Sequence, residues 1–225
     1  MPKPRAHHVP RRESTWWDPV DQGWWIAVLF AVGSTCFALG AAPGYVDAVG
    51  VSADAVTFFV GSLFFTTAAA LQFLEVAGHR ATAPVDWWAG AVQLAGTLLF
   101  NISTGVAMGQ HLTTHQEDRL VWTPDAFGSI AFLVASGLAW WATCRGWWAW
   151  RPRNLSWSIA ALNLAGSFAF GVSAVASYVV PADDQPRNAT LMNLGTFVGA
   201  LCFLAGALLL LPERTRAPAL ASSRA

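Results

Sequence analysis

Charged side chains are scarce in this sequence. Of its 225 residues, 13 are lysine or arginine and 13 are aspartate or glutamate, so charged residues make up only 12%. An average water-soluble domain carries about 25%. With 55% hydrophobic residues and a mean hydropathy of +0.43, the chain has too little polar surface to cover itself in water. We therefore expect an integral membrane protein whose main partner is the lipid bilayer.

The few charges also balance to a formal net charge of zero. Nucleic-acid-binding proteins carry an excess of lysine and arginine on one face. The totals therefore give no indication of a nucleic-acid partner.

Cysteine and histidine are also rare. Cys36, Cys144 and Cys202 fall in or at the ends of apolar segments without forming a close pair, which excludes a disulfide framework and a cysteine metal site. No histidine lies within an apolar segment, so a helical bundle would have no axial haem ligand. Hydrolase, zinc-protease and phosphate-loop motifs are absent from the sequence. We expect no catalytic activity, no cofactor and no metal.

One histidine pair leaves an alternative open. His111 and His115 are four residues apart and precede Glu117 and Asp118. This spacing would suit zinc or copper if the segment were helical. Since no third ligand is apparent in the sequence, an ordinary polar loop is the prediction and metal binding the alternative.

Six apolar runs are long enough to cross a bilayer, which takes about 20 residues. They lie near residues 24–42, 55–77, 87–107, 126–144, 157–180 and 191–211, and we expect Pro212 to stop the last one. The prediction is an all-α membrane protein with six transmembrane helices in three tandem helical hairpins, at about 24–78, 86–145 and 156–211. Residues 1–23 and 212–225 are predicted to be cytoplasmic segments outside the bundle.

The basic residues predict the orientation, because cytoplasmic loops are enriched in lysine and arginine. With the N-terminus in the cytoplasm, only Arg119 and Arg187 of the 13 basic residues lie on the outer side. Tryptophans cluster at the predicted cytoplasmic helix ends, and only Trp122 lies on the outer side. Both termini are therefore expected in the cytoplasm. Frequent alanine, tryptophan and arginine hint at a GC-rich bacterial genome and hence a multi-pass protein of a bacterial plasma membrane.

A five-residue motif, Gly-small-x-x-Phe, occurs once in each apolar run. Its glycines are Gly33, Gly61, Gly96, Gly128, Gly166 and Gly199. Residues four apart share a helix face, so each helix presents a small residue beside an aromatic ring. Helices in lipid associate closely at small residues, and we expect the six glycines to mediate helix packing. The hairpins could then surround a pseudo-threefold axis, or the first and last could pair with the middle one wedged between them.

Four polar residues fall in or near the predicted cytoplasmic half of the bundle: Gln72, Glu75, Gln93 and Asn163. Gln93 and Asn163 both stand three residues before a motif glycine, which predicts that both face the interior. Glu75 is a candidate proton or cation site, because carboxylates within membranes are often functional. The favoured interpretation is structural, since amides hydrogen-bond neighbouring helices and Glu75 can reach water or Arg80.

The segments Phe58–Phe65 and Phe197–Gly206 resemble the YrhK-like family of small bacterial membrane proteins. That family consists of two-helix units with a glycine-small-x-x-Phe motif in both helices. The resemblance covers the first and last hairpins well and the middle hairpin loosely. It implies a hairpin unit, but the family has no established activity, so no functional residues can be transferred.

Three functions remain to be compared. The first is a structural or regulatory bundle whose helices pack against one another or against a partner, either a second copy of the chain or another membrane protein. The second is a small-solute or ion transporter or channel, with Gln72, Glu75, Gln93 and Asn163 lining a polar cavity on the cytoplasmic side. The third, a membrane enzyme or redox subunit, has the least support because no catalytic constellation is visible.

Overall fold

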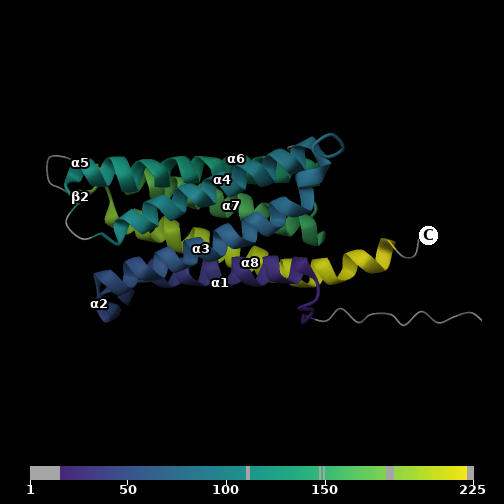
Figure 1. Ribbon diagram of the computed structural model, residues 1–225, viewed down its shortest axis with the longest axis horizontal. Helices are drawn as coiled ribbons and strands as arrows, with labels where there is room; N and C mark the ends of the chain where they lie inside the picture. Colours follow the sequence, from purple (N-terminus) through teal and green to yellow (C-terminus); the bar gives the residue numbers. More distant parts are fainter. Residues whose placement is uncertain (1–15, 110–111, 147, 149, 181–184, 222–225) are drawn as a thin grey trace, which may run out of the picture.

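Six long helices form one antiparallel bundle in the computed structural model, which describes residues 16–109, 112–146, 148, 150–180 and 185–221 (Figure 1). Each helix is long and apolar enough to cross a membrane, so the chain is a multi-pass membrane protein. The helices are α1 (Gln22–Gly40), α3 (Val51–Val76), α4 (Pro84–Ala107), α6 (Thr123–Cys144), α7 (Leu155–Ala176) and α8 (Ala189–Ala221).

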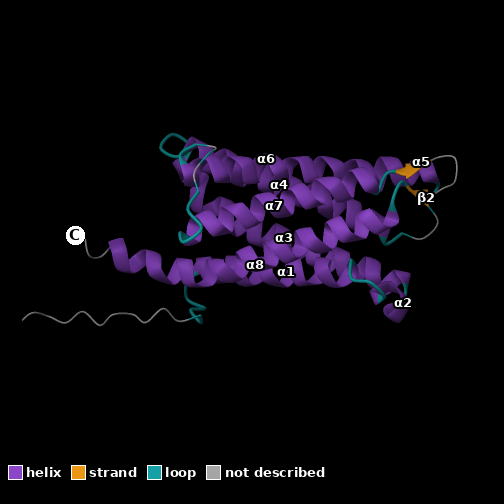
Figure 2. Ribbon diagram, turned by 180° about the vertical axis from the view of Figure 1, so that it is seen from behind, coloured by secondary structure: helices purple, strands orange, loops and turns teal. Residues whose placement is uncertain are grey.

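Short elements connect the helices at the two ends of the bundle (Figure 2). A 3₁₀ turn, η1 (Ala77–His79), follows α3 at the end where α1 begins and α8 ends. At the opposite end lie α2 (Tyr45–Val49), α5 (Thr114–Glu117), the π-helical turn η2 (Asp118–Trp122) and an antiparallel pair of two-residue strands, β1 (Val179–Val180) and β2 (Gln185–Pro186).

The helices contact one another in a closed ring that follows their order in the chain. Three hairpins, α1 with α3, α4 with α6 and α7 with α8, supply three of the interfaces. The other three join neighbouring hairpins, namely α3 with α4, α6 with α7 and α8 with α1. Since the last helix closes on the first, the hairpins surround one axis, and the alternative with a wedged middle hairpin does not occur.

Polar residues stand at the starts of five of the long helices. The side chain of Asp21 caps α1 by accepting a hydrogen bond from the backbone N–H of Gly23 at 2.9 Å, and Asn154 caps α7 in the same way. Asp54, Asp86 and Asp125 lie in the first turns of α3, α4 and α6. Acidic residues are favoured in the first turn because the N-terminus is the positive end of the helix dipole.

Two predicted helix ends are wrong. The helix α8 continues through Pro212 to Ala221, because a proline removes one backbone hydrogen bond without preventing later turns from forming. Residues 212–221 are therefore helical rather than an irregular tail. The fifth helix stops at Ala176 instead of residue 180, since the β-branched pair Val179 and Val180 forms the strand β1.

The six motif glycines are buried and face each other within the hairpins. A methyl carbon added at Gly33 would lie 2.9 Å from the carbonyl oxygen of Gly61, and the corresponding distance between Gly166 and Gly199 is 3.0 Å. The middle hairpin repeats the contact at Gly128, whose added methyl would lie 3.2 Å from the carbonyl oxygen of Gly96. Each pair of helices therefore approaches backbone to backbone at its two motifs.

Each motif glycine also receives the phenylalanine ring of its partner helix. A methyl carbon at Gly33 would lie 2.7 Å from the ring of Phe65, and one at Gly61 would lie 3.0 Å from the ring of Phe37. The same exchange joins Gly96 with Phe132, Gly128 with Phe100, Gly166 with Phe203 and Gly199 with Phe170. The motif thus works reciprocally, with the glycine of one helix making room for the ring of the other.

We predict that Gly166→Ala destabilises the bundle whereas Gly171→Ala does not. The added methyl at position 166 would lie 3.0 Å from the carbonyl oxygen of Gly199, while nothing lies within 4 Å of a methyl at position 171. Overpacking of this kind costs about 1–3 kcal/mol. At Gly171 only the helix propensity changes, which favours alanine by about 1 kcal/mol.

Thermal melts of the purified variants in one detergent measure this difference, since both substitutions lie on α7 and add the same methyl group. Gly96→Leu should lower the melting temperature further, and by more than Glu75→Gln does. Equal melting temperatures for the variants at positions 166 and 171 would contradict a packing role for the motif glycine.

Candidate functional site on the bundle axis

Six phenylalanine rings from the motifs meet on the axis of the bundle. Phe37, Phe100 and Phe170 form one triangle, with ring centroids 6.0–6.3 Å apart. Phe65, Phe132 and Phe203 form a second triangle at 5.7–6.2 Å. Contacts at 5.2–5.6 Å within each hairpin join the two layers. The rings therefore mark the corners of a trigonal prism, which we call the phenylalanine prism.

The phenylalanine prism fills the centre of the bundle. All six rings belong to one buried cluster, in which their exposed fractions are between 2% and 8%. Most of the pairs are edge-to-face, a geometry that favours aromatic contact by about 0.5–1.5 kcal/mol per pair beyond the area buried. The rings close the axis at this level.

A cavity of about 90 Å³ lies directly against one face of the prism. Phe65, Phe132 and Phe203 form its roof, and its walls come from all six helices. The cavity lies toward the end of the bundle where α1 begins, because its wall residues in α3, α6 and α8 follow the motif. The space is large enough to hold water molecules.

The walls of the cavity carry three of the four predicted polar residues. Gln72, Gln93 and Asn163 line it together with Ser136. The side-chain amide of Gln93 donates a hydrogen bond from Nε2 to Oε1 of Gln72 at 3.3 Å, which joins α4 to α3. These neutral groups offer both donors and acceptors to a bound molecule.

Glu75 is not among the side chains that line this cavity. It lies on α3 one turn beyond Gln72 and is half-buried. Arg80 lies over the rings of Trp87 and Trp88, with its guanidinium carbon 4.7 and 5.6 Å from the ring centroids. Of the four polar residues assigned to a possible cavity, Gln72, Gln93 and Asn163 therefore line this one, and Glu75 lies about one turn nearer the bundle end.

Asn163 lies close to the backbone of α8. Its Oδ1 would be 2.8 Å from a methyl carbon added at Gly206, another residue of the cavity wall. The corresponding wall position in α1, three residues before the motif glycine, is Phe30 rather than an amide. The cavity is consequently polar toward α3, α4 and α7 and apolar toward α1.

Hydroxyl pairs join two of the three interfaces between hairpins. Ser62 Oγ and Thr104 Oγ1 lie 3.0 Å apart between α3 and α4. Between α6 and α7, the Oγ atoms of Ser136 and Ser167 lie 2.7 Å apart, and Ser167 also donates to the carbonyl oxygen of Phe132 at 3.2 Å. In α1 the corresponding Ser34 Oγ is buried without a hydrogen-bond partner.

The alternative of a metal site at His111 and His115 receives no support from the described residues. His115 and Glu117 lie on the short helix α5, so this part of the segment is indeed helical, while His111 lies outside the described residues. Within the described part of the chain, no three histidine, cysteine, aspartate or glutamate side chains gather where they could hold a metal ion.

Sequence reasoning missed the convergence of the rings and the role of Ser136. The spacing of the motif shows that glycine and phenylalanine share a face, but not that all six faces turn toward one axis. The missing signal for Ser136 was its register: it stands eight residues after Gly128, as Ala69 stands after Gly61 and Ala207 after Gly199. Only the middle hairpin has a hydroxyl at that position.

We predict that replacing Gln72 and Gln93 by leucine gives coupled effects on stability. Each single change leaves the other amide without its partner, whereas the double change removes both. A double-mutant cycle in detergent should give a coupling energy of about 0.5–1.5 kcal/mol. Gln72→Leu combined with Asn193→Leu, at an exposed residue of α8, is the control and should be additive. Additivity in the glutamine pair would show that the hydrogen bond contributes nothing.

Ser34 and Ser167 offer a second matched comparison. Both serines directly follow a motif glycine and both are fully buried, but only Ser167 has hydrogen-bond partners. We expect Ser167→Ala to lower the free energy of unfolding by about 1 kcal/mol, and Ser34→Ala to leave it unchanged or raise it. Unfolding in a denaturant series measures both, and a larger loss for Ser34→Ala would contradict this assignment.

Comparison of the chain with protein-family models, with curated proteins and with solved structures found no match. The resemblance to the YrhK-like family therefore stays a prediction that depends on the motif residues alone.

Proposed function

We propose that this protein is a structural or regulatory membrane bundle without catalytic activity. The single observation that supports this function is the phenylalanine prism, which fills the axis with six rings at centroid distances of 5.2–6.3 Å. A protein that conducts solutes in this conformation would need an open or polar path at that level. The bundle instead has the dense interior of a scaffold that packs against itself or a partner.

The proposal includes the orientation and the partners. The strong bias of lysine and arginine toward one side supports cytoplasmic termini, and the composition supports a bacterial plasma membrane. A second copy of the chain or another membrane protein is the proposed partner. Similar motif contacts in all three hairpins favour a repeated hairpin unit of the kind that the YrhK-like resemblance implies.

The cavity favours transport of a small solute as a second candidate function. Gln72, Gln93 and Asn163 lie around about 90 Å³ of space, and a purely structural core would be expected to fill such space with apolar atoms. In this case the phenylalanine prism would be a closed barrier, and its rings would have to move apart for a solute to pass. The proposed substrate class is a small solute or ion.

One flux experiment distinguishes the two functions. Purified protein is reconstituted into vesicles, and the entry of urea, glycerol or potassium is followed by stopped-flow light scattering. For a sealed bundle, we expect wild-type vesicles to match protein-free vesicles, because the six rings close the axis. The double change Phe132→Ala and Phe203→Ala removes two of the three rings that form the roof of the cavity, and it should raise the flux several-fold.

Saturable flux through the wild-type protein would contradict the structural proposal and support transport. Gln93→Leu should then abolish that flux, while the exposed Asn193→Leu should leave it unchanged. Thermal melts of each variant show whether a lost or gained flux reflects unfolding.

A further inference from the structure

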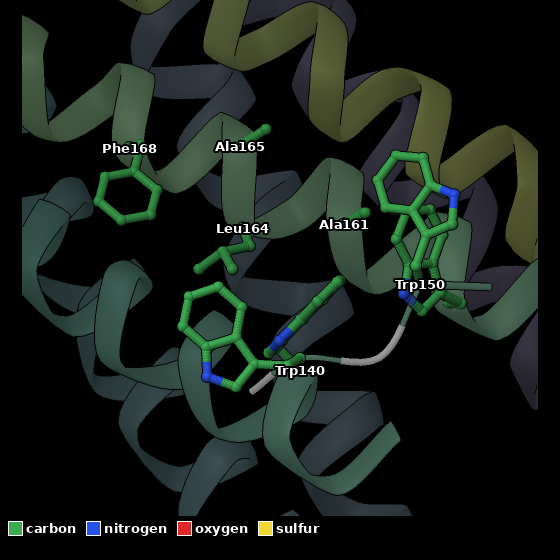
Figure 3. Close-up of a pocket in the computed structure, with 8 residues that line it drawn as sticks. Trp140, Trp150, Ala161, Leu164, Ala165 and Phe168 are labelled. Carbon is green, nitrogen blue, oxygen red and sulfur yellow. The ribbon is translucent and has the colours of Figure 1, made fainter. Parts of the chain in front are cut away.

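An apolar groove of about 480 Å³ runs along the outward face of α7, at the end of the bundle where α7 begins. Figure 3 shows the side chains of Ala161, Leu164, Ala165 and Phe168 following one another along this helix, with indole rings beside them. Trp157 packs against Trp140 and Trp150 at centroid distances of 5.5 and 5.1 Å. The rings thus form a wall at one end of a strip of small and apolar side chains.

Three arginines lie near this groove, in a stretch of the chain that contains no acidic residue. The connection between α6 and α7 contains Arg145, Arg151 and Arg153, all of them exposed. From residue 126 to residue 182 the sequence has no aspartate or glutamate. Since Arg151 directly follows the groove residue Trp150, the charges lie at the same end of the bundle as the indole rings.

The equivalent connection between α3 and α4 is arranged differently. Its single arginine, Arg80, already lies over the rings of Trp87 and Trp88. Among the described residues, no aromatic ring covers the guanidinium groups of Arg145, Arg151 or Arg153 in this way. Because Arg145, Arg151 and Arg153 are exposed, an anion from outside the chain can reach them.

Arg145 occupies the left-handed turn that ends α6. It has φ 53° and is the only residue other than glycine with a positive φ in the described part of the chain. Glycine or asparagine usually occupies this position after a helix, because other side chains are strained there.

We propose that this groove binds an anionic phospholipid. One acyl chain lies along Ala161, Leu164 and Phe168, and the phosphate lies among the three arginines. Guanidinium groups form strong charge-assisted hydrogen bonds with phosphate oxygens, and basic clusters at the ends of transmembrane helices bind anionic headgroups. Indole rings settle at the headgroup level, where the two parts of the lipid meet. This inference does not depend on whether the bundle is structural or transports a solute.

Native mass spectrometry of the full chain in detergent tests the proposal. The protein is titrated with phosphatidylglycerol or with phosphatidylcholine that carries the same acyl chains. We expect an affinity about tenfold higher or more for phosphatidylglycerol. The triple change Arg145→Gln, Arg151→Gln and Arg153→Gln should remove that preference and leave phosphatidylcholine binding unchanged. Arg119→Gln with Arg187→Gln, at the opposite end of the bundle, is the matched control and should keep the preference.

Two further measurements separate the lipid from other occupants. Ala161→Phe fills the groove and should weaken phosphatidylglycerol binding, while thermal melts without lipid show that each variant remains folded. Glycerol phosphate, which has the charge but no acyl chains, should not compete. Equal affinity for the two lipids, an unchanged preference in the triple variant, or full competition by glycerol phosphate would overturn the proposal.

Discussion

The distance between the two backbones of each hairpin is the constraint on which the rest of this structure depends. Where two glycines face each other, an added methyl carbon would lie about 3 Å from the opposite carbonyl oxygen. Only this close approach lets each helix place its phenylalanine ring over the glycine of its partner. Because lipid tails are as apolar as leucine, such contact supplies the attraction that the hydrophobic effect supplies in water. Three hairpins with the same motif contacts then bring six rings to one axis, where each ring contacts three others at favourable distances.

Contacts between hairpins use the residue that follows the glycine. These residues are serine, threonine or alanine in all six helices, and all are buried. Hydroxyl pairs join α3 to α4 and α6 to α7. At the closing interface between α8 and α1, Trp24 and Ala27 pack against Leu211, and Ser34 Oγ in α1 is buried without a hydrogen-bond partner. Hydroxyl pairs thus join two of the three interfaces between hairpins, and apolar side chains pack at the third.

Much of this architecture could be predicted from the sequence, because lipid restricts the choices. The six spans, the hairpin order and the acidic first turns follow from hydropathy, charge and spacing. The end of α8 could not be predicted, since proline indicates a probable rather than a necessary stop. The motif identified Gly33 and Phe37 as neighbours on one face. It could not show that this face turns toward the common axis, because rotation of a helix depends on every neighbour at once. The sequence also identified Gln72, Glu75, Gln93 and Asn163 as polar residues of one half of the bundle. Which of them line a common cavity depends on the rotation of each helix and could not be predicted.

The polar chemistry of the interior lies where corresponding positions of the hairpins differ. In the first helix of each hairpin (α1, α4 and α7), the residue three positions before the motif glycine is Phe30, Gln93 or Asn163. In the second helix (α3, α6 and α8), the residue eleven positions after the motif glycine is Gln72, Ala139 or Leu210. All six line the cavity beneath the phenylalanine prism. Phe30 and Leu210 show that apolar side chains can occupy these positions in this bundle. Packing around the axis therefore does not require amides there. The amides make one side of the cavity polar, and the six rings fill the axis directly beside it.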